Sequence, residues 1–261
     1  MDLGIRGKVA LVTGASDGLG FATARALAAE GVKLAIAARR EDKLGDAADA
    51  IRGDTGAEVV AIPADVTVRD QAARLSDDVR AKLGPVEILV ANAGGPKPGG
   101  FDDFAWEEWA RAFQQIVGAV HNLASAVVPS MRDRKWGRIV SIQSMSIRQP
   151  VESLLLSNSL RPAAAGLLKG LASELAPHGI TVNVIGPGSS RTERILELGR
   201  HRNPGRADDE VLRILGASMP IGRLVEPDEV AAAVTFLCSA RAAAITGTYL
   251  PVDGGQIRCQ M

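Results

Sequence analysis

The 261-residue sequence is poor in aromatic residues, which make up 3% of it and include a single tyrosine, Tyr249. Aliphatic side chains and alanine must therefore build the core, within a hydrophobic fraction of 46%. Two cysteines are too few for a disulfide framework and fit a reducing compartment. Thirty Lys and Arg residues balance thirty Asp and Glu residues, so no excess charge points to a nucleic-acid or anionic-membrane partner.

The sequence also lacks any apolar run that approaches the ~20 residues of a membrane-spanning helix. Its N-terminus, MDLGIRGKVALVTGAS, runs directly into a predicted strand and does not have the pattern of a signal peptide. No group of His, Cys and Asp residues has the spacing of metal ligands. We therefore expect a cytoplasmic protein without a metal site and without a membrane partner.

Short aliphatic runs alternate with alanine-rich helical segments along the whole chain. The predicted strands are KVALVTG, KLAIAAR, EVVAIPAD, EILVANAG, GRIVSIQS, GITVNVIGPG and TGTYLPVDGG. Such alternation implies parallel strands joined by right-handed crossovers, with helices on both faces. The sequence thus predicts an α/β fold in which residues 1–261 form a single doubly wound (Rossmann) domain with a parallel sheet of about seven strands.

A glycine-rich loop follows the first predicted strand and opens the first helix, with the sequence Thr13-Gly14-Ala15-Ser16-Asp17-Gly18-Leu19-Gly20. Gly14 permits the tight turn, Gly18 lets a pyrophosphate approach the backbone, and Gly20 lets the helix pack closely on the strand. Free amides at the helix N-terminus then face the phosphates. Glycines alone are weak support, but this context, with Asn92-Ala93-Gly94 after the fourth strand, indicates a dinucleotide site.

Four motifs in this order resemble the short-chain dehydrogenase/reductase family, most closely its 3-oxoacyl-carrier-protein reductase branch. They are the TGxxxGxG loop, NAG after strand four, PG after strand six and VDGG near the C-terminus, and they span nearly the whole chain. The resemblance implies that Asp65 and Val66 hold the adenine, and that Asn92 to Gly94 pass under the adenosine ribose. It also implies that Pro187, Gly188 and Thr192 lie beside the nicotinamide, and that residues 189–218 cover the substrate.

The second predicted strand ends in Arg39 and Arg40, with no acidic residue before Glu41. A carboxylate there would accept hydrogen bonds from the ribose 2′-hydroxyl of NAD, whereas a guanidinium can grip the 2′-phosphate of NADP. We therefore predict that NADP(H) is preferred over NAD(H). Asp17 argues mildly the other way, because many NADP-preferring members of the family carry a base there, and two solvated arginines are the alternative interpretation. The complete set of predicted cofactor-binding residues is Gly14, Ser16, Gly18, Leu19, Gly20, Arg39, Arg40, Asp65, Val66, Asn92, Ala93, Gly94, Pro187, Gly188 and Thr192.

The catalytic pattern of the family is not intact in this sequence. The resemblance implies a Ser, a Tyr and a Lys, assisted by an Asn. Counting without gaps retains the serine as Ser144 but places Ser157, Arg161 and Ile116 at the tyrosine, lysine and asparagine positions. Ser144, Ser157 and Arg161 are therefore the candidate catalytic residues. Serine is a far weaker acid than a phenol, and arginine stays protonated, so neither replaces the usual proton relay.

Other residues do not obviously restore the missing acid. Tyr249 falls inside the last predicted strand, where a packed aromatic is the simpler interpretation. His201, in the segment that would cover the substrate, and Glu152 are candidates that also suit a solvated surface. Pro162 prefers the first turn of a helix, so we expect the helix of roughly 159–177 to begin near Ser159, with Ser157 in the preceding loop.

Three functions stay open at this point. The first is an NADP(H)-dependent oxidoreductase that orients the carbonyl or hydroxyl of a small molecule with Ser144 and takes its proton from water or from a side chain not yet identified. The second is a catalytically silent NADP(H)-binding or sensor protein. The third, favoured least, is a non-redox lyase or dehalogenase on the same scaffold. The resemblance also implies a homo-oligomer, a dimer or tetramer, that pairs through the helices near 106–133 and 159–177.

Overall fold

The computed structural model describes residues 1–259, and its strands form one parallel sheet in the order β3-β2-β1-β4-β5-β6-β7. The order reverses between β1 and β4, which places a crevice outside the carboxyl ends of these two strands. The predicted seven-stranded doubly wound sheet is confirmed. The strands are β1 Val9–Thr13, β2 Lys33–Ala38, β3 Val59–Pro63, β4 Ile88–Asn92, β5 Gly137–Ile142, β6 Ile180–Pro187 and β7 Tyr249–Val252.

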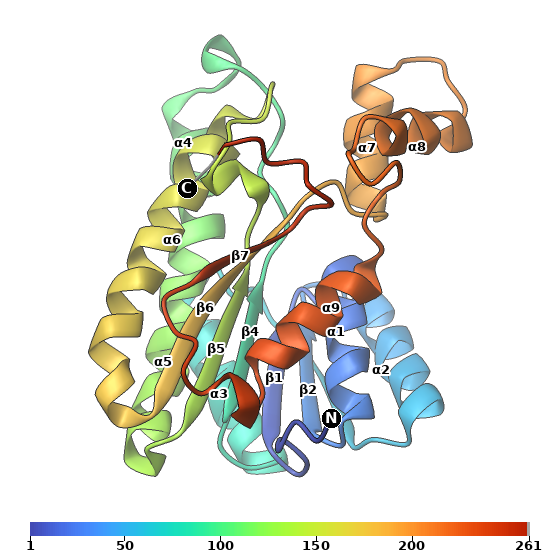
Figure 1. Ribbon diagram of the computed structural model, residues 1–261. Coiled ribbons are helices and arrows are strands. Elements are labelled where there is room, and N and C mark those ends of the chain that lie inside the picture. Colours follow the sequence, from blue (N-terminus) through green and yellow to red (C-terminus); the bar gives the residue numbers. More distant parts are fainter. Residues whose placement is uncertain (260–261) are drawn as a thin grey trace.

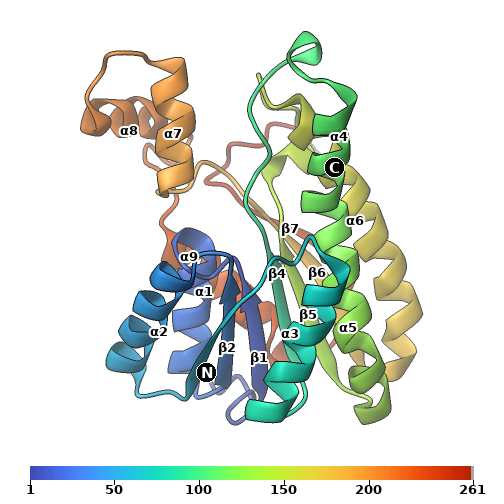
Figure 2. The ribbon, with the colours of Figure 1, turned by 180° about the vertical axis from the view of Figure 1, so that it is seen from behind.

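Helices cover both faces of the sheet (Figures 1 and 2). One face packs against α1 (Gly18–Ala29), α2 (Glu41–Thr55) and α9 (Pro227–Leu237). The other packs against α3 (Arg69–Lys82), α5 (Ala119–Arg134) and α6 (Leu155–Leu175). A separate lobe of α7 (Glu193–Arg202) and α8 (Asp208–Ala217) stands beyond the carboxyl ends of the strands (Figure 1). Within residues 1–259, no helix combines the length and the apolar character needed to cross a membrane.

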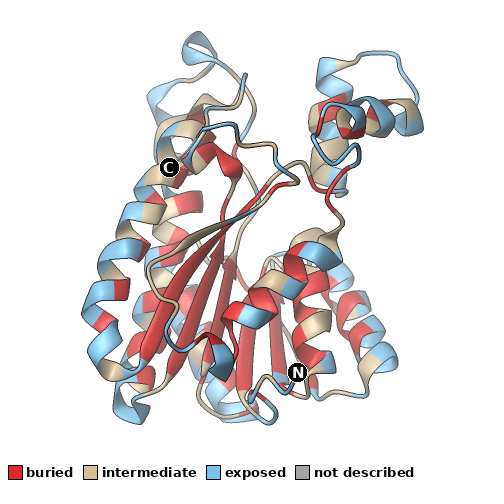
Figure 3. Ribbon diagram, in the orientation of Figure 1, coloured by how far each residue is buried: buried red, intermediate tan, exposed pale blue. Residues whose placement is uncertain are grey.

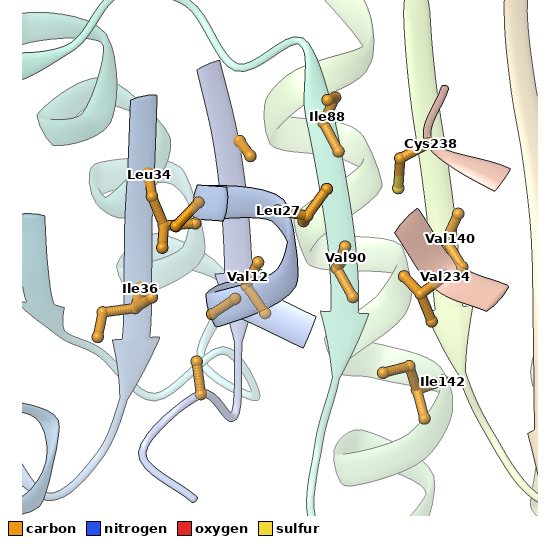
Figure 4. Packing of buried hydrophobic residues seen from close by; sticks show 14 of the residues in the cluster. Val12, Leu27, Leu34, Ile36, Ile88, Val90, Val140, Ile142, Val234 and Cys238 are labelled. Carbon is orange, nitrogen blue, oxygen red and sulfur yellow. The ribbon is translucent and has the colours of Figure 1, made fainter. Parts of the chain in front are cut away.

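The core consists of two apolar layers, one on each face of the sheet (Figure 3). Strands buried on both faces are expected to be continuous aliphatic runs, and every residue of β1 is buried. Figure 4 shows Leu27 of α1 and Val234 of α9 directed at the sheet, and Cys238 near the strand that carries Val140, in the same cluster. Cys238 is thus a small core residue, and burial raises the pKa of its thiol to about 12.

The helix before β5 contains a π-helical turn. It runs as α4 (Trp106–Phe113), a π turn at Gln114–Gly118, and then α5. The sequence predicted helical structure near 106–133, and the π turn lies within that range. It contains Ile116, which is buried at the position where the family would place an asparagine. Such turns frequently occur at functional sites.

Helix α6 begins at Leu155, so the prediction that it starts near Ser159 and leaves Ser157 in a loop is wrong. Pro162 lies in the helix interior, where proline typically costs about 3 kcal/mol. Contacts with residues outside the helix hold the first turn in place. The Asn158 side chain bonds both the N–H and the C=O of Val151, at 3.0 and 2.8 Å. The Leu155 amide donates to the Gly99 carbonyl at 3.2 Å.

Candidate active site

A cleft of about 1810 Å³ opens at the carboxyl ends of the strands. Its walls are the loops after β1 to β6 together with α7, so residues far apart in the sequence meet there. Every predicted site residue except Gly20 lines this cleft. Open α/β sheets bind their ligands at this edge, beside the reversal in strand order.

The glycine loop has the backbone that its sequence predicted. Gly14 and Gly18 have φ angles of 58° and 55°, in the left-handed region that glycine adopts freely. A side chain on Gly20 would collide with the carbonyl oxygen of Gly14, which explains why α1 can approach the loop so closely. Asp17, the N-cap residue of α1, makes no side-chain cap. The first amides of α1 are therefore available to an anionic group at this end of the cleft.

Asn92 joins the loops after β1 and β4. Its Nδ2 donates to the Gly14 carbonyl at 3.1 Å, and its backbone N–H donates to the Thr13 hydroxyl at the same distance. The Thr13 hydroxyl in turn donates to the Asn92 carbonyl at 2.8 Å. Because these bonds use the Asn92 amide, they assign that side chain to holding the two loops together. Ala93 and Gly94 continue along the cleft wall.

The two arginines after β2 differ in their surroundings. Arg40 forms an ion pair with Asp17, with 3.0 Å between Nη2 and Oδ2. Arg39 lines the same end of the cleft and is exposed, and it has no ion pair within residues 1–259. Asp17 therefore offsets the charge of Arg40, and Arg39 is the cation left free for a ligand.

Asp65 and Val66 lie on the cleft wall after β3. The Oδ1 atom of Asp65 accepts hydrogen bonds from the backbone and the hydroxyl of Thr67, at 3.0 and 2.7 Å. This turn precedes α3, which begins at Arg69. One carboxylate oxygen is thus committed to the local turn, and Oδ2 has no bond within the described residues.

The loop after β6 forms a further part of the cleft wall. A side chain on Gly188 would approach within 2.8 Å of the Cα of Asp253, so only glycine lets the two loops pack together. Thr192 is the N-cap of α7 and lies within contact distance of the space above Gly18. Pro187, Gly188 and Thr192 therefore line the cleft, with Thr192 next to the glycine loop.

Ser144 follows β5 and lines the cleft. Its hydroxyl oxygen accepts a hydrogen bond from the Ser146 backbone N–H at 3.1 Å, and this bond caps a short 3₁₀ turn. Because the oxygen acts as acceptor in that bond, the hydroxyl proton is free to be donated to a ligand oxygen.

Ser157 and Arg161 are one turn apart on α6 and belong to a buried polar chain. The Arg161 Nε donates to the Ser157 hydroxyl at 3.1 Å, and that hydroxyl lies 3.1 Å from the hydroxyl of Ser146. The Arg161 Nη1 donates to Oε1 of Gln143 at 3.2 Å. Gln143 in turn donates to Ser141 at 2.7 Å. The Ser157 hydroxyl is therefore occupied by its neighbours within the protein.

Arg161 exposes 9% of its surface, and burial with the nearby positive charge of Arg194 lowers its pKa to about 10. It is still a cation at neutral pH. Sequence reasoning missed Gln143, Ser146 and Arg194. Ser141 lies in β5 and Gln143 directly follows that strand, so their spacing of two residues puts both side chains on one side, and this was a usable signal. Arg194 reaches the site from α7, and nothing in its local sequence indicated that.

Tyr249 does not reach the cleft. Its hydroxyl donates to the backbone carbonyl of Ser144 at 3.2 Å, and its ring packs over Gly186. Burial, and next the charge of Asp253, raise its pKa to about 12, while Arg148, 5.4 Å from the ring, acts against them. Its interpretation as a packed strand aromatic agrees with this geometry.

The two remaining candidate acids differ in their place relative to the cleft. His201 is exposed on α7 and is not among the cleft-lining residues, whereas Glu152 is among them. Lys169, two turns beyond Arg161 on α6, is also outside the cleft lining, and its ammonium donates to the Gly247 carbonyl at 2.8 Å. Within residues 1–259, the cleft lining contains no His, Tyr or Cys.

The parallel sheet, the glycine loop after β1 and the N-terminus of α1, which has no side-chain cap, are the features of a dinucleotide-binding α/β protein. Comparison with known proteins then gives the family. Residues 14–256 match the family model described as enoyl-(acyl carrier protein) reductase. The chain is 34% identical over 255 residues to 2,3-dihydro-2,3-dihydroxybenzoate dehydrogenase of Bacillus subtilis, covering 97% of each chain. It is 36% identical over 253 residues to 3-oxoacyl-[acyl-carrier-protein] reductase of Escherichia coli, covering 97% of this chain and 98% of the relative.

A solved structure with the same architecture is L-sorbose reductase from Gluconobacter frateurii complexed with NADPH and L-sorbose. The two chains are 33% identical, with a TM-score of 0.95 and complete coverage of both. This chain therefore belongs to the short-chain dehydrogenase/reductase family, as its four motifs predicted. The chain is thus an oxidoreductase of a family whose members act on small molecules.

Proposed function

We propose that this protein is an NADP(H)-dependent oxidoreductase that interconverts a carbonyl and a hydroxyl group of a small molecule without the Tyr–Lys pair of its family. One observation carries the proposal: the glycine loop and a hydroxyl with a free proton, that of Ser144, line the same cleft. The cofactor, when bound, supplies or accepts the hydride. The residues named below bind it and orient the substrate.

The cofactor's phosphates fit the first turn of α1. The amides there lack a side-chain cap, and the left-handed Gly14 and Gly18 bring the backbone close to the cleft. We assign the 2′-phosphate to Arg39, because Arg40 is paired with Asp17. Binding of NADPH to L-sorbose reductase, which shares this fold, supports that choice, and NAD(H) is the second candidate.

Ser144 positions the substrate oxygen by donating its hydroxyl proton to it. The proton that completes reduction comes from water, since Ser157 is bonded to Arg161 and Ser146 and is a weak acid. Loss of a general acid typically slows catalysis by about 10²- to 10⁴-fold. We therefore expect slow turnover.

The decisive experiment combines binding and turnover. NADPH at one hundred times its dissociation constant should stabilise the protein by about 2.7 kcal/mol. NADH at the same concentration should stabilise it by less, because we expect it to bind more weakly. Arg39→Ala should remove that preference, while Arg213→Ala, an exposed arginine on α8 outside the cleft, should keep it. NADPH consumption across a panel of ketones and quinones should depend on Ser144, and Ser144→Ala should abolish it.

The buried network also supports a second candidate, a silent NADP(H)-binding protein. Three catalytic positions differ from the family together, and two of these residues, Ser157 and Arg161, bond to each other. NADPH binding without consumption of any substrate would favour this candidate. Absence of stabilisation by either dinucleotide would contradict both and favour a non-redox reaction in the same cleft.

We further propose that residues 1–261 act as one unit in the cytoplasm, assembled as a homodimer or homotetramer. Residues 189–218, which include α7 and α8, would cover the bound substrate. Their position beyond the carboxyl ends of the strands supports this role (Figure 2).

A further inference from the structure

Arg161 is a buried cation without a counter-ion. Two of its three guanidinium nitrogens donate to neutral partners, Ser157 and Gln143. The third, Nη2, has no hydrogen bond within residues 1–259, and no carboxylate in that range forms an ion pair with Arg161. Arg161 exposes 9% of its surface and lines the cleft. Burial of an unpaired charge costs free energy, and a ligand of opposite charge would offset that cost by pairing with it.

A second guanidinium reaches the same place from the lobe. A Cβ built on Gly95 would lie 3.5 Å from Nε of Arg194 and 3.8 Å from Nη2 of Arg161. Arg194 is anchored by its Nη2, which donates to the Pro96 carbonyl at 2.6 Å. Its Nη1 lies 3.4 Å from Glu197, which offsets part of its charge. Two guanidinium groups therefore border the space that a side chain at position 95 would fill. Because residue 95 is glycine, its own side chain does not fill that space.

The like charges make this arrangement costly in the free protein. Burial, and next the positive charge of Arg194, lower the pKa of Arg161, which nevertheless stays at about 10. Arg161 is therefore still a cation at neutral pH. An anion over Gly95 would relieve the repulsion and satisfy the free Nη2.

We propose that Arg161 and Arg194 form a subsite over Gly95 that binds a carboxylate of the substrate, so that the enzyme acts on carbonyl compounds that are also carboxylic acids. The inference rests on the proposed function and adds the substrate class. A guanidinium fork suits a planar carboxylate. The phosphates of the cofactor have their own place at α1, after β1, whereas Gly95 follows β4 and Arg161 bonds the Ser157–Ser146 pair next to Ser144.

Calorimetric binding of acetoacetate tests the subsite directly, first to the protein alone and then to the protein saturated with NADP⁺. Methyl acetoacetate is the uncharged match. Loss of a charge-assisted hydrogen bond should weaken acetoacetate binding about 10- to 100-fold in Arg161→Gln and in Arg194→Gln. The ester should bind equally to all variants. Arg213→Gln removes an exposed arginine of the same lobe outside the cleft and should change nothing.

Gly95→Ala provides a variant that keeps both charges. The added methyl group meets its neighbours at ordinary contact distances, so the fold should tolerate it, yet it occupies the space that the carboxylate needs. It should weaken acetoacetate binding and spare the thermal stability. This separates occupation of the subsite from any effect of Arg161→Gln on the buried network.

Three results would overturn the subsite: no binding of acetoacetate, equal weakening of acid and ester, or binding that NADP⁺ displaces and that inorganic phosphate reproduces. The last would assign the two arginines to the cofactor's phosphates. The outcome is separable from the proposed function. Arg161-dependent acetoacetate binding without stabilisation by NADPH would refute the function and keep the subsite, whereas NADPH-dependent reduction of neutral ketones alone would do the reverse.

Discussion

At the scale of single residues, the site is notable for which side chains are already occupied. Ser157 accepts a hydrogen bond from Arg161, and Arg40 pairs with Asp17. Ser144 and Arg39 keep a donor free. Residue type alone does not distinguish these cases, because the serines and the arginines each have the same chemistry in isolation. The hydrogen-bond partners decide which of them can serve a ligand.

Tyr249 offers a clean measurement, since it is the one tyrosine of the chain. Its pKa is raised to about 12 from an ordinary value of 10. The buried neutral phenol therefore stabilises the fold below pH ~10, and this contribution is lost as the pH rises toward 12. Ultraviolet titration should show little phenolate in the native protein at pH ~11 and mostly phenolate in denaturant. Equal phenolate in both would place Tyr249 in water, and Tyr249→Phe supplies the blank.

At the scale of elements, α6 decides what a restored catalytic pair could do. The helix begins at Leu155, so Ser157 and Arg161 lie one turn apart on its inner side despite Pro162. Asn158, bonded to Val151, holds this first turn and is the local signal that offsets the proline. A tyrosine and a lysine at these two positions would therefore face the cleft without any change at Pro162.

We accordingly expect Ser157→Tyr with Arg161→Lys to raise turnover of neutral ketones by up to about 10²- to 10⁴-fold, the usual contribution of a general acid. The initial rate of NADPH consumption measures this. Ser157→Phe with Arg161→Lys is the matched control, because it has the ring without the hydroxyl. Rescue that requires the additional removal of Pro162 would show that α6 does not hold its first turn in solution.

At the scale of the whole molecule, one side of α6 is exposed and lined by small residues. Gly166 and Gly170 are exposed, and a Cβ on either would meet nothing within 4 Å. The alanine- and glycine-rich stretch of this helix therefore does not serve an internal face at these positions. It is available to pack closely against another copy of the chain.

Gly166→Arg should accordingly shift the protein from dimer or tetramer toward monomer in sedimentation velocity. Gly53→Arg is the control, since Gly53 is also an exposed helical glycine with open space around it, on α2. Because arginine is a better helix former than glycine, neither change should unfold the monomer. A wild-type protein that sediments as a monomer would contradict the expected assembly.

The sequence by itself determined the architecture and the nucleotide end of the cleft. Strand and helix periods are local properties, and the glycine loop was legible because backbone needs at Gly14, Gly18 and Gly20 restrict residue type. The absence of a tyrosine at position 157 was also readable from the sequence, because the chain has a single tyrosine, Tyr249, in the last predicted strand.

Only the tertiary structure decided the start of α6, the pairing of Arg40 with Asp17, and the meeting of Arg161 with Arg194 over Gly95. Each depends on contacts between separate segments of the chain. Local propensity carries no information about such contacts, and here it misled, because the preference of Pro162 for a first turn was outweighed by bonds from Asn158 and Leu155 to preceding loops. Packing, which acts on the whole chain at once, settled these points.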